Sequence, residues 1–251
     1  MQAKNKNLLN NIKEKASNKL PQIALLIDPD KLNEAALIEM CKSAEKCNVD
    51  FLLVGGSLLT SGDLNTTVNT IKSNCNLKCL LFPGSASQIS PEADGILFLS
   101  LLSSRNPEML IGQQVVAAPY LRKTNLEVIP TAYMIVESGK QTTASYISNS
   151  NPIPADKAEI AASTALAGEY MGMAITYLDA GSGAQHPVPL EMIQKVREFT
   201  QNPIIVGGGI NNQSAMTKAF EAGADVIVIG TAVEQDPEFM QEIKAIKTHN
   251  Y

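Results

Sequence analysis

The chain has 251 residues, of which 45% are hydrophobic and 18% are charged, and its formal net charge is −5. The acidic balance and the absence of Trp exclude the basic, aromatic-rich surface typical of nucleic-acid-binding proteins. No apolar run has the length of a membrane span or a signal peptide, so a cytoplasmic location is expected. The length suits one α/β barrel, and we expect a single domain over residues 1–251 with a short polar N-terminal helix and a C-terminal tail.

The first predicted strand ends in two carboxylates. After a helix predicted at residues 8–19, residues 23–27 form an apolar run that leads into Asp28, Pro29 and Asp30. In a parallel barrel the carboxyl ends of the strands form the active face, so this turn places acidic oxygens there. Asp28 is the better candidate for a divalent cation such as Mg²⁺, which prefers oxygen ligands. The alternative role for Asp30 is to cap the next helix.

The second predicted strand, at residues 51–54, follows a helix predicted at residues 31–47 and ends in a Gly-Gly-Ser turn. Such a turn can offer its backbone amides and its serine hydroxyl to a ligand. Ser57 is therefore a candidate contact for a metal ion or a phosphate group.

The third and fourth predicted strands lie close together in the chain. A helix is predicted at residues 63–73, and the two strands at residues 79–82 and 95–99. The segment between these strands is short for a full crossover helix, so one helix of the fold is expected to be reduced.

The longest polar segment follows the fifth predicted strand. A helix at residues 106–118 precedes this strand, at residues 128–136, and residues 137–154 are then rich in Ser, Thr and Asn. A segment of this length is either a binding loop over one face of the domain or disordered.

The last third of the chain repeats one pattern three times. Apolar runs at residues 173–178, 204–206 and 226–229 each lead into a glycine-rich turn. Glycine lets the backbone approach a ligand closely, and helices that begin after such turns favour anions. The turns predict a phosphate site, against the alternative that the glycines serve tight turns alone.

Taken together, eight apolar segments alternate with helical ones, which predicts a (β/α)8 TIM barrel. The apolar runs are continuous rather than alternating, as in strands that are buried on both faces. The remaining helices are predicted at residues 155–170, 190–199, 212–222 and 237–247.

Six motifs in order resemble the geranylgeranylglyceryl phosphate synthase and PcrB-like prenyltransferase family, and more closely its archaeal-type and related bacterial branch. The resemblance runs from about residue 23 to residue 233. The motifs are Ile27-Asp28-Pro29-Asp30-Lys31, Val54-Gly55-Gly56-Ser57, Phe82-Pro83-Gly84, Pro130-Thr131-Ala132-Tyr133, Tyr177-Leu178-Asp179-Ala180-Gly181-Ser182-Gly183 and Val206-Gly207-Gly208-Gly209-Ile210.

The resemblance implies a Mg²⁺-dependent enzyme that joins sn-glycerol 1-phosphate to a polyprenyl diphosphate, with geranylgeranyl diphosphate as the expected donor. It implies Mg²⁺ binding at Asp28 and Ser57. It also implies self-association into a homo-oligomer, and the lipid substrate allows transient contact with a membrane surface. The implied contacts to glycerol phosphate are Tyr177, Leu178, Asp179, Ala180, Gly181, Ser182, Gly183, Gly208, Gly209, Gly230 and Thr231.

The expected chemistry gives Asp179 the role of general base for the attacking hydroxyl. Tyr120 and Tyr133 are candidates for the groove that holds the prenyl chain. Two positions depart from the family's pattern. Asp179 stands where many members have the longer Glu, so it takes the proton either directly or through a water molecule. Leu26 stands where some members have a Lys that binds phosphate.

Three alternatives stay open from the sequence. One is a synthase that takes another chain length, such as a heptaprenyl donor. The second is a different phosphate-binding barrel, an isomerase or synthase of small metabolites. The third is a barrel that binds a phosphorylated ligand without turnover.

Overall fold

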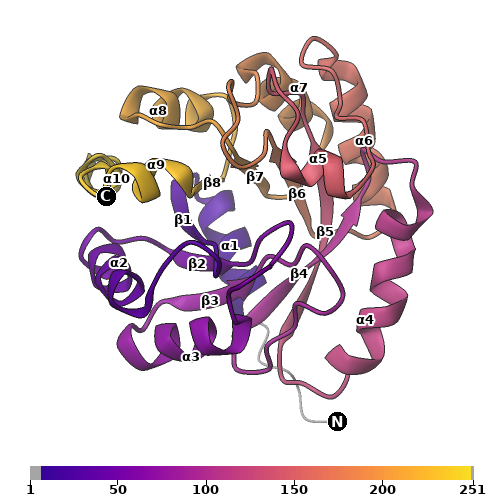
Figure 1. Ribbon diagram of the computed structural model, residues 1–251. Helices are drawn as coiled ribbons and strands as arrows, with labels where there is room; N and C mark the ends of the chain where they lie inside the picture. Colours follow the sequence, from indigo (N-terminus) through magenta and orange to yellow (C-terminus); the bar gives the residue numbers. More distant parts are fainter. Residues whose placement is uncertain (1–6, 250–251) are drawn as a thin grey trace.

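The computed structural model describes residues 7–249, and the two ends of the predicted domain, residues 1–6 and 250–251, lie outside this part. Eight parallel strands close into a barrel in sequence order (Figure 1). Each predicted strand is present with its ends shifted by no more than two residues. The strands are β1 (Gln22–Ile27), β2 (Phe51–Val54), β3 (Lys78–Leu81), β4 (Gly95–Leu101), β5 (Glu127–Ile135), β6 (Ile175–Asp179), β7 (Ile204–Gly207) and β8 (Val226–Ile229).

Both faces of these strands are buried, which explains their continuous apolar sequences. One set of side chains, including Leu53, Leu97 and Ile205, fills the inside of the barrel. A second set, including Leu52 and Val206, packs between the strands and the outer helices. The wall of the barrel is therefore a rigid support for the turns at its carboxyl ends.

Helices surround the barrel (Figure 1). Residues 82–94, between β3 and β4, contain no helix, which agrees with the predicted reduction of one unit. A five-residue π-helix, η1, leads directly into α4. The helices are α1 (Asn7–Ser17), α2 (Glu34–Lys46), α3 (Leu64–Asn74), η1 (Glu108–Gly112), α4 (Gln113–Leu121), α5 (Thr143–Ile147), α6 (Ala158–Tyr170), α7 (Leu190–Phe199), α8 (Gln213–Glu221), α9 (Thr231–Gln235) and α10 (Phe239–His249).

Asp30 does not cap α2. The cap is Asn33, whose side chain accepts a hydrogen bond from the amide of Ala36 at 3.0 Å. Asp30 instead accepts hydrogen bonds from the Thr60 hydroxyl and from three consecutive amides, Thr60 to Gly62, in the loop after β2. These hydrogen bonds lower the pKa of Asp30 to about 2. The bonds from the Thr60 and Gly62 amides are the largest cause.

The polar segment 137–154 is folded over the carboxyl end of the barrel and contains a short helix that the sequence reading missed. Helix α5 begins with a reciprocal cap, in which the side chains of Thr142 and Ser145 each bond the other's backbone amide. A bridge between Val136 and Ile153 closes the segment at its base. The segment is therefore in place to cover a ligand.

Helix α1 closes the opposite end of the barrel. Its apolar side chains Leu8 and Ile12 are buried in the same cluster as the barrel interior. The Glu127 carboxylate accepts hydrogen bonds from the amides of Leu8, at 2.8 Å, and Leu9, at 3.1 Å, at the start of the helix. This carboxylate satisfies free amides of the first helical turn.

A buried ion-pair network ties the chain ends to the barrel. The Asp50 carboxylate lies 2.8 Å from the Lys247 ammonium and 2.6 Å from that of Lys15, and it accepts the amide of Ile23 at 2.7 Å. Lys247 also donates to the carbonyl of Pro21 at 2.9 Å. The side chain of Lys247 is only 2% exposed.

We expect Asp50→Asn to lower the free energy of unfolding by about 3–5 kcal/mol, because it removes the carboxylate that faces the buried Lys247 ammonium. Urea denaturation followed by circular dichroism measures this loss. Lys195→Gln is the matched control, since it removes an exposed pair with Glu198 that contributes about 0–1 kcal/mol. Equal effects of the two substitutions would refute the assignment.

No helix among residues 7–249 has both the length and the apolar character needed to cross a bilayer.

Candidate active site

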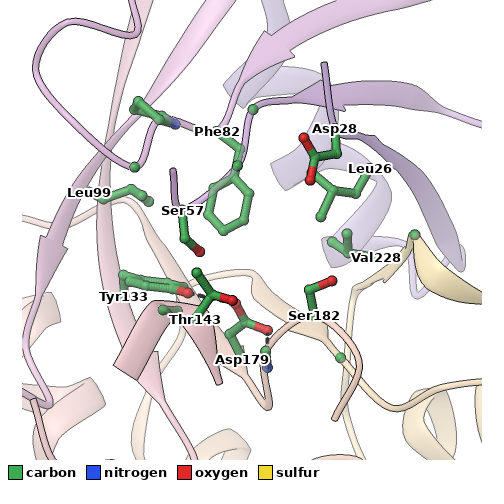
Figure 2. A pocket seen from close by; sticks show the side chains of 18 of the residues that line it. Leu26, Asp28, Ser57, Phe82, Leu99, Tyr133, Thr143, Asp179, Ser182 and Val228 are labelled. Carbon is green, nitrogen blue, oxygen red and sulfur yellow. Dashed lines mark hydrogen bonds between the residues drawn. The ribbon is translucent and has the colours of Figure 1, made fainter. Parts of the chain in front are cut away.

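A cavity of about 480 Å³ opens at the carboxyl ends of the strands. This volume is in the range of small-molecule sites. Figure 2 shows Asp28 and Asp179 on different sides of it, with the ring of Phe82 between them. Residues that follow each of the eight strands contribute to its lining, among them Asp28, Ser57, Phe82, Ala117, Thr143, Ser182, Gly208 and Thr231.

Asp179 ends β6 and turns its carboxylate into this cavity (Figure 2). One oxygen accepts the hydroxyl of Tyr133 at 2.6 Å, and the other accepts the amide of Gly181 at 2.7 Å. Burial raises the pKa of Asp179, while these two hydrogen bonds act in the opposite direction. A buried carboxylate held by two donors, with a raised pKa, is suited to accept a proton from a bound hydroxyl.

Three aromatic rings support Asp179. Phe82 stacks on Tyr177 with ring centres 5.2 Å apart, and Tyr133 stands edge-on to both rings at 5.7 and 5.4 Å. Burial is the main cause that raises the pKa of both tyrosines well above 10, so their hydroxyls stay protonated. The rings keep this side of the cavity dry and rigid.

The glycine turns after β6, β7 and β8 meet at one side of the cavity. Gly208 has a φ of +83°, and a Cβ there would lie 2.6 Å from the amide nitrogen of Gly181. Only glycine permits this approach of two backbones. The hydroxyls of Ser182 and Thr231 lie 3.4 Å apart. Backbone and hydroxyl groups from three turns therefore converge, as a phosphate site requires.

The first two turns meet at Asp28. One Asp28 oxygen accepts the amide of Asp30 at 3.1 Å, and a Cβ on Gly56 would lie 3.4 Å from the carboxylate. Ser57 also lines the cavity, and its hydroxyl is drawn in Figure 2. The described residues contain no group of three or more His, Cys, Asp or Glu side chains arranged to hold a metal. One carboxylate and one hydroxyl are an incomplete ligand set, which suits Mg²⁺ only together with substrate phosphates.

Gln88 fixes the turns after β2 and β3 to each other. Its side-chain oxygen accepts the amide of Gly84 and its nitrogen donates to the carbonyl of Gly56, both at 3.0 Å. The side chain is 6% exposed. The sequence carries no local signal for this contact, because it joins residues 32 positions apart.

The cavity extends outward between β3 and β4. These two strands pair over only two residue pairs, Leu80 with Gly95 and Leu81 with Ile96. Beyond them, residues on both faces of β4 line the cavity, Leu99 and Phe98 among them, and so does Ala117 of α4. The missing helix leaves this apolar passage open.

The predicted site residues fall into two groups. Most of them line the cavity, namely Asp28, Ser57, Tyr133, Tyr177, Asp179, Gly181, Ser182, Gly183, Gly208, Gly209, Gly230 and Thr231. The side chains of Leu178 and Ala180 do not, because they alternate to the outer face of the barrel and pack under the helices. Tyr120 also lies outside the cavity, on α4 and 61% exposed. The hydroxyl of Tyr133 donates to Asp179, and the place of its ring in a prenyl groove stays a prediction.

The chain is similar to known proteins over most of its length. Residues 13–249 match the PcrB family. The geranylgeranylglyceryl phosphate synthase of Spirosoma linguale is 48% identical over 223 residues, which are 89% of this chain and 90% of that protein. The synthase of Chitinophaga pinensis is 43% identical over 94% of each chain.

A solved structure also matches over nearly the whole chain. It is (S)-3-O-geranylgeranylglyceryl phosphate synthase from Thermoplasma acidophilum in complex with sn-glycerol-1-phosphate, with a TM-score of 0.90 and 34% identity over 97% of this chain and 98% of that one. The motifs, the barrel and these relatives lead to one conclusion: the chain belongs to the geranylgeranylglyceryl phosphate synthase and PcrB-like family.

Proposed function

We propose that the protein is a prenyltransferase that joins sn-glycerol 1-phosphate to a polyprenyl diphosphate, with geranylgeranyl diphosphate as the donor. The observation that carries the proposal is the meeting of a glycine-lined phosphate site, a buried carboxylate and an apolar passage in one cavity. The Thermoplasma acidophilum relative was crystallised with sn-glycerol-1-phosphate, which supports the acceptor.

The reaction uses each part of the cavity. The allylic C–O bond of the donor breaks, diphosphate leaves with the bonding electrons, and a glycerol hydroxyl forms the new ether bond at the same carbon. Asp179 takes the proton of that hydroxyl, directly or through a water molecule. The turns at Gly208 and Ser182 hold the glycerol phosphate, so they decide which hydroxyl faces the donor.

A Mg²⁺ ion would be held in the first half of the barrel. Asp28 would supply a carboxylate and Ser57 a hydroxyl, and phosphate oxygens of the donor would complete the ligand set. When bound, the ion stabilises the charge that develops on the leaving diphosphate. Asp28 also accepts the Asp30 amide, which orients the carboxylate before any ligand arrives.

The prenyl chain follows the passage between β3 and β4. Helix α1 closes the other end of the barrel, so the chain leaves the cavity sideways, past Leu99 and Phe98 toward Ala117. These side chains bury hydrocarbon surface, which favours binding by roughly 25 cal/mol per Å².

The test is incubation of the purified protein with radiolabelled sn-glycerol 1-phosphate, Mg²⁺ and polyprenyl diphosphates of increasing length, followed by dephosphorylation and chromatography. A labelled prenylglycerol that is lost on chelation of Mg²⁺ is the expected result, and the best donor gives the chain length. Absence of product with every donor, despite binding of glycerol phosphate, would refute the proposal and favour another phosphate-barrel chemistry.

Tyr133→Phe should shift the acid limb of the pH profile of kcat/KM to higher pH. The hydroxyl of Tyr133 stabilises the ionised form of Asp179, so its removal raises the pKa of that carboxyl further above its usual range. The active, ionised form then appears only at higher pH. Tyr177→Phe is the control, since among the described hydrogen bonds its hydroxyl donates to no carboxylate. An unchanged acid limb in Tyr133→Phe would contradict the role of Asp179 as base.

A further inference from the structure

The charges that line the cavity are unusual for a site that takes phosphorylated substrates. The described lining residues include three carboxylates, Asp28, Asp179 and Glu234, and a single cationic side chain, Lys31. Both proposed substrates are anions. The Lys140 ammonium lies just outside this lining, 3.7 Å from the position that a Cβ on Gly183 would take, so Lys31 has a large share in the electrostatic balance on the side of the first turn.

Lys31 joins the first and the last turns of the barrel. Its ammonium lies 2.8 Å from the Glu234 carboxylate on α9 and 3.9 Å from the Asp28 carboxylate. Its amide donates to the carbonyl of Asp28 at 3.1 Å, which holds the residue in the turn. Glu234 lies three positions after Thr231, in the short helix that follows the last glycine turn. The ammonium is thus held at the rim of the cavity, between two carboxylates.

The pair with Glu234 is weak enough to exchange for a ligand. The Lys31 side chain is 40% exposed, so water and salt screen its attraction to Glu234. A diphosphate carries more negative charge than a carboxylate and offers more acceptor oxygens. A lysine ammonium is a point charge on a flexible stem, so it can turn to such a ligand without movement of the backbone.

We propose that Lys31 binds the diphosphate group of the donor and stabilises it as it leaves, and that the Glu234 carboxylate pairs with the Lys31 ammonium until the donor displaces it. This inference rests on the proposed function. Diphosphate is favoured over glycerol phosphate because the backbone of Lys31 belongs to the turn of Asp28, which is assigned to the diphosphate, and only its ammonium reaches across to Glu234. In the transfer step Lys31 forms no covalent bond and keeps its protons.

Isothermal titration calorimetry with inorganic diphosphate and Mg²⁺ tests the proposal without turnover. Lys31→Gln should raise the Kd for diphosphate about tenfold or more, while the Kd for sn-glycerol 1-phosphate, titrated separately, stays within about twofold. Lys42→Gln is the matched control. It removes an ammonium of similar exposure on α2 that pairs with Glu39 at 3.1 Å, away from the cavity.

Two further variants separate the role of each side chain. Lys31→Arg keeps the charge and should bind diphosphate more tightly than Lys31→Gln. Glu234→Gln removes the competing carboxylate and should lower the Kd for diphosphate, with little effect in the Lys31→Gln background. An unchanged diphosphate Kd in Lys31→Gln, or a loss confined to glycerol phosphate, overturns the inference. Failure of the proposed function is a separate result, namely no prenylglycerol from the wild-type protein.

Discussion

Asp179→Asn should lower kcat by about 10²- to 10⁴-fold, the range that a positioned general base contributes. The amide has nearly the same shape as the carboxylate and can still accept one hydrogen bond from Tyr133 or Gly181, so the cavity keeps its form. The substitution removes the carboxylate that is proposed to take the proton of the glycerol hydroxyl. Single-turnover rates measured with saturating donor report this loss directly.

Binding of sn-glycerol 1-phosphate distinguishes catalysis from binding in the same variant. The proposed phosphate contacts come from the glycine turns and from Ser182, so the Kd should change by no more than about threefold. Asp156→Asn, which removes an exposed carboxylate paired with Lys157, controls for the loss of one charge. If Asp179→Asn lost glycerol phosphate affinity and kept its rate at saturation, Asp179 would be a binding residue.

Asp28→Asn should lower kcat/KM for the prenyl diphosphate by about 10²- to 10³-fold, or roughly 3–4 kcal/mol of transition-state stabilisation. The amide oxygen can still accept the Asp30 amide, so the turn is kept. The loss arises because a neutral oxygen holds a divalent cation less well than a carboxylate. The Mg²⁺ concentration for half-maximal activity should rise in parallel.

Asp30→Asn provides the matched control for Asp28, two residues away in the same turn. Its carboxylate faces the loop at residues 60–62 and not the cavity, so the variant should keep the wild-type response to Mg²⁺. Equal Mg²⁺ responses of Asp28→Asn and the wild-type protein would show that Asp28 holds no metal.

The barrel itself could be predicted from local sequence. Each strand is a short, continuous apolar run, and each run is followed by a turn rich in glycine or polar residues. Burial on both faces imposes this pattern on every strand independently, so eight local predictions combine into one fold. The short helix α5 was missed because it has only five residues and lies within a polar segment, so it shows no helical period of apolar residues. The spacing of Thr142 and Ser145, which form the reciprocal cap, is the signal that predicts such a helix start.

The site was predictable only in part. The turns that hold Asp28, Asp179 and Gly208 could be placed at the carboxyl ends of the strands, because the fold brings those ends together. The contacts between turns could not be predicted, since they join residues far apart in the chain. Tyr133 is 46 residues from Asp179, and Lys31 is 203 residues from Glu234. The sequence could thus place Tyr133 near the site, but it could not predict that the Tyr133 hydroxyl bonds the Asp179 carboxylate.

The cap on the first helix has a consequence for the order of folding. The amide of Leu8 bonds Glu127, 119 residues later in the chain, and its side chain packs inside the barrel. During synthesis the ribosome releases α1 long before β5 exists, so the helix lacks both its cap and the interior that buries it. Contacts of such long sequence separation form slowly. Helix α1 is therefore synthesised before β5 but reaches its final position only after it, and until then its apolar face is not buried in the barrel.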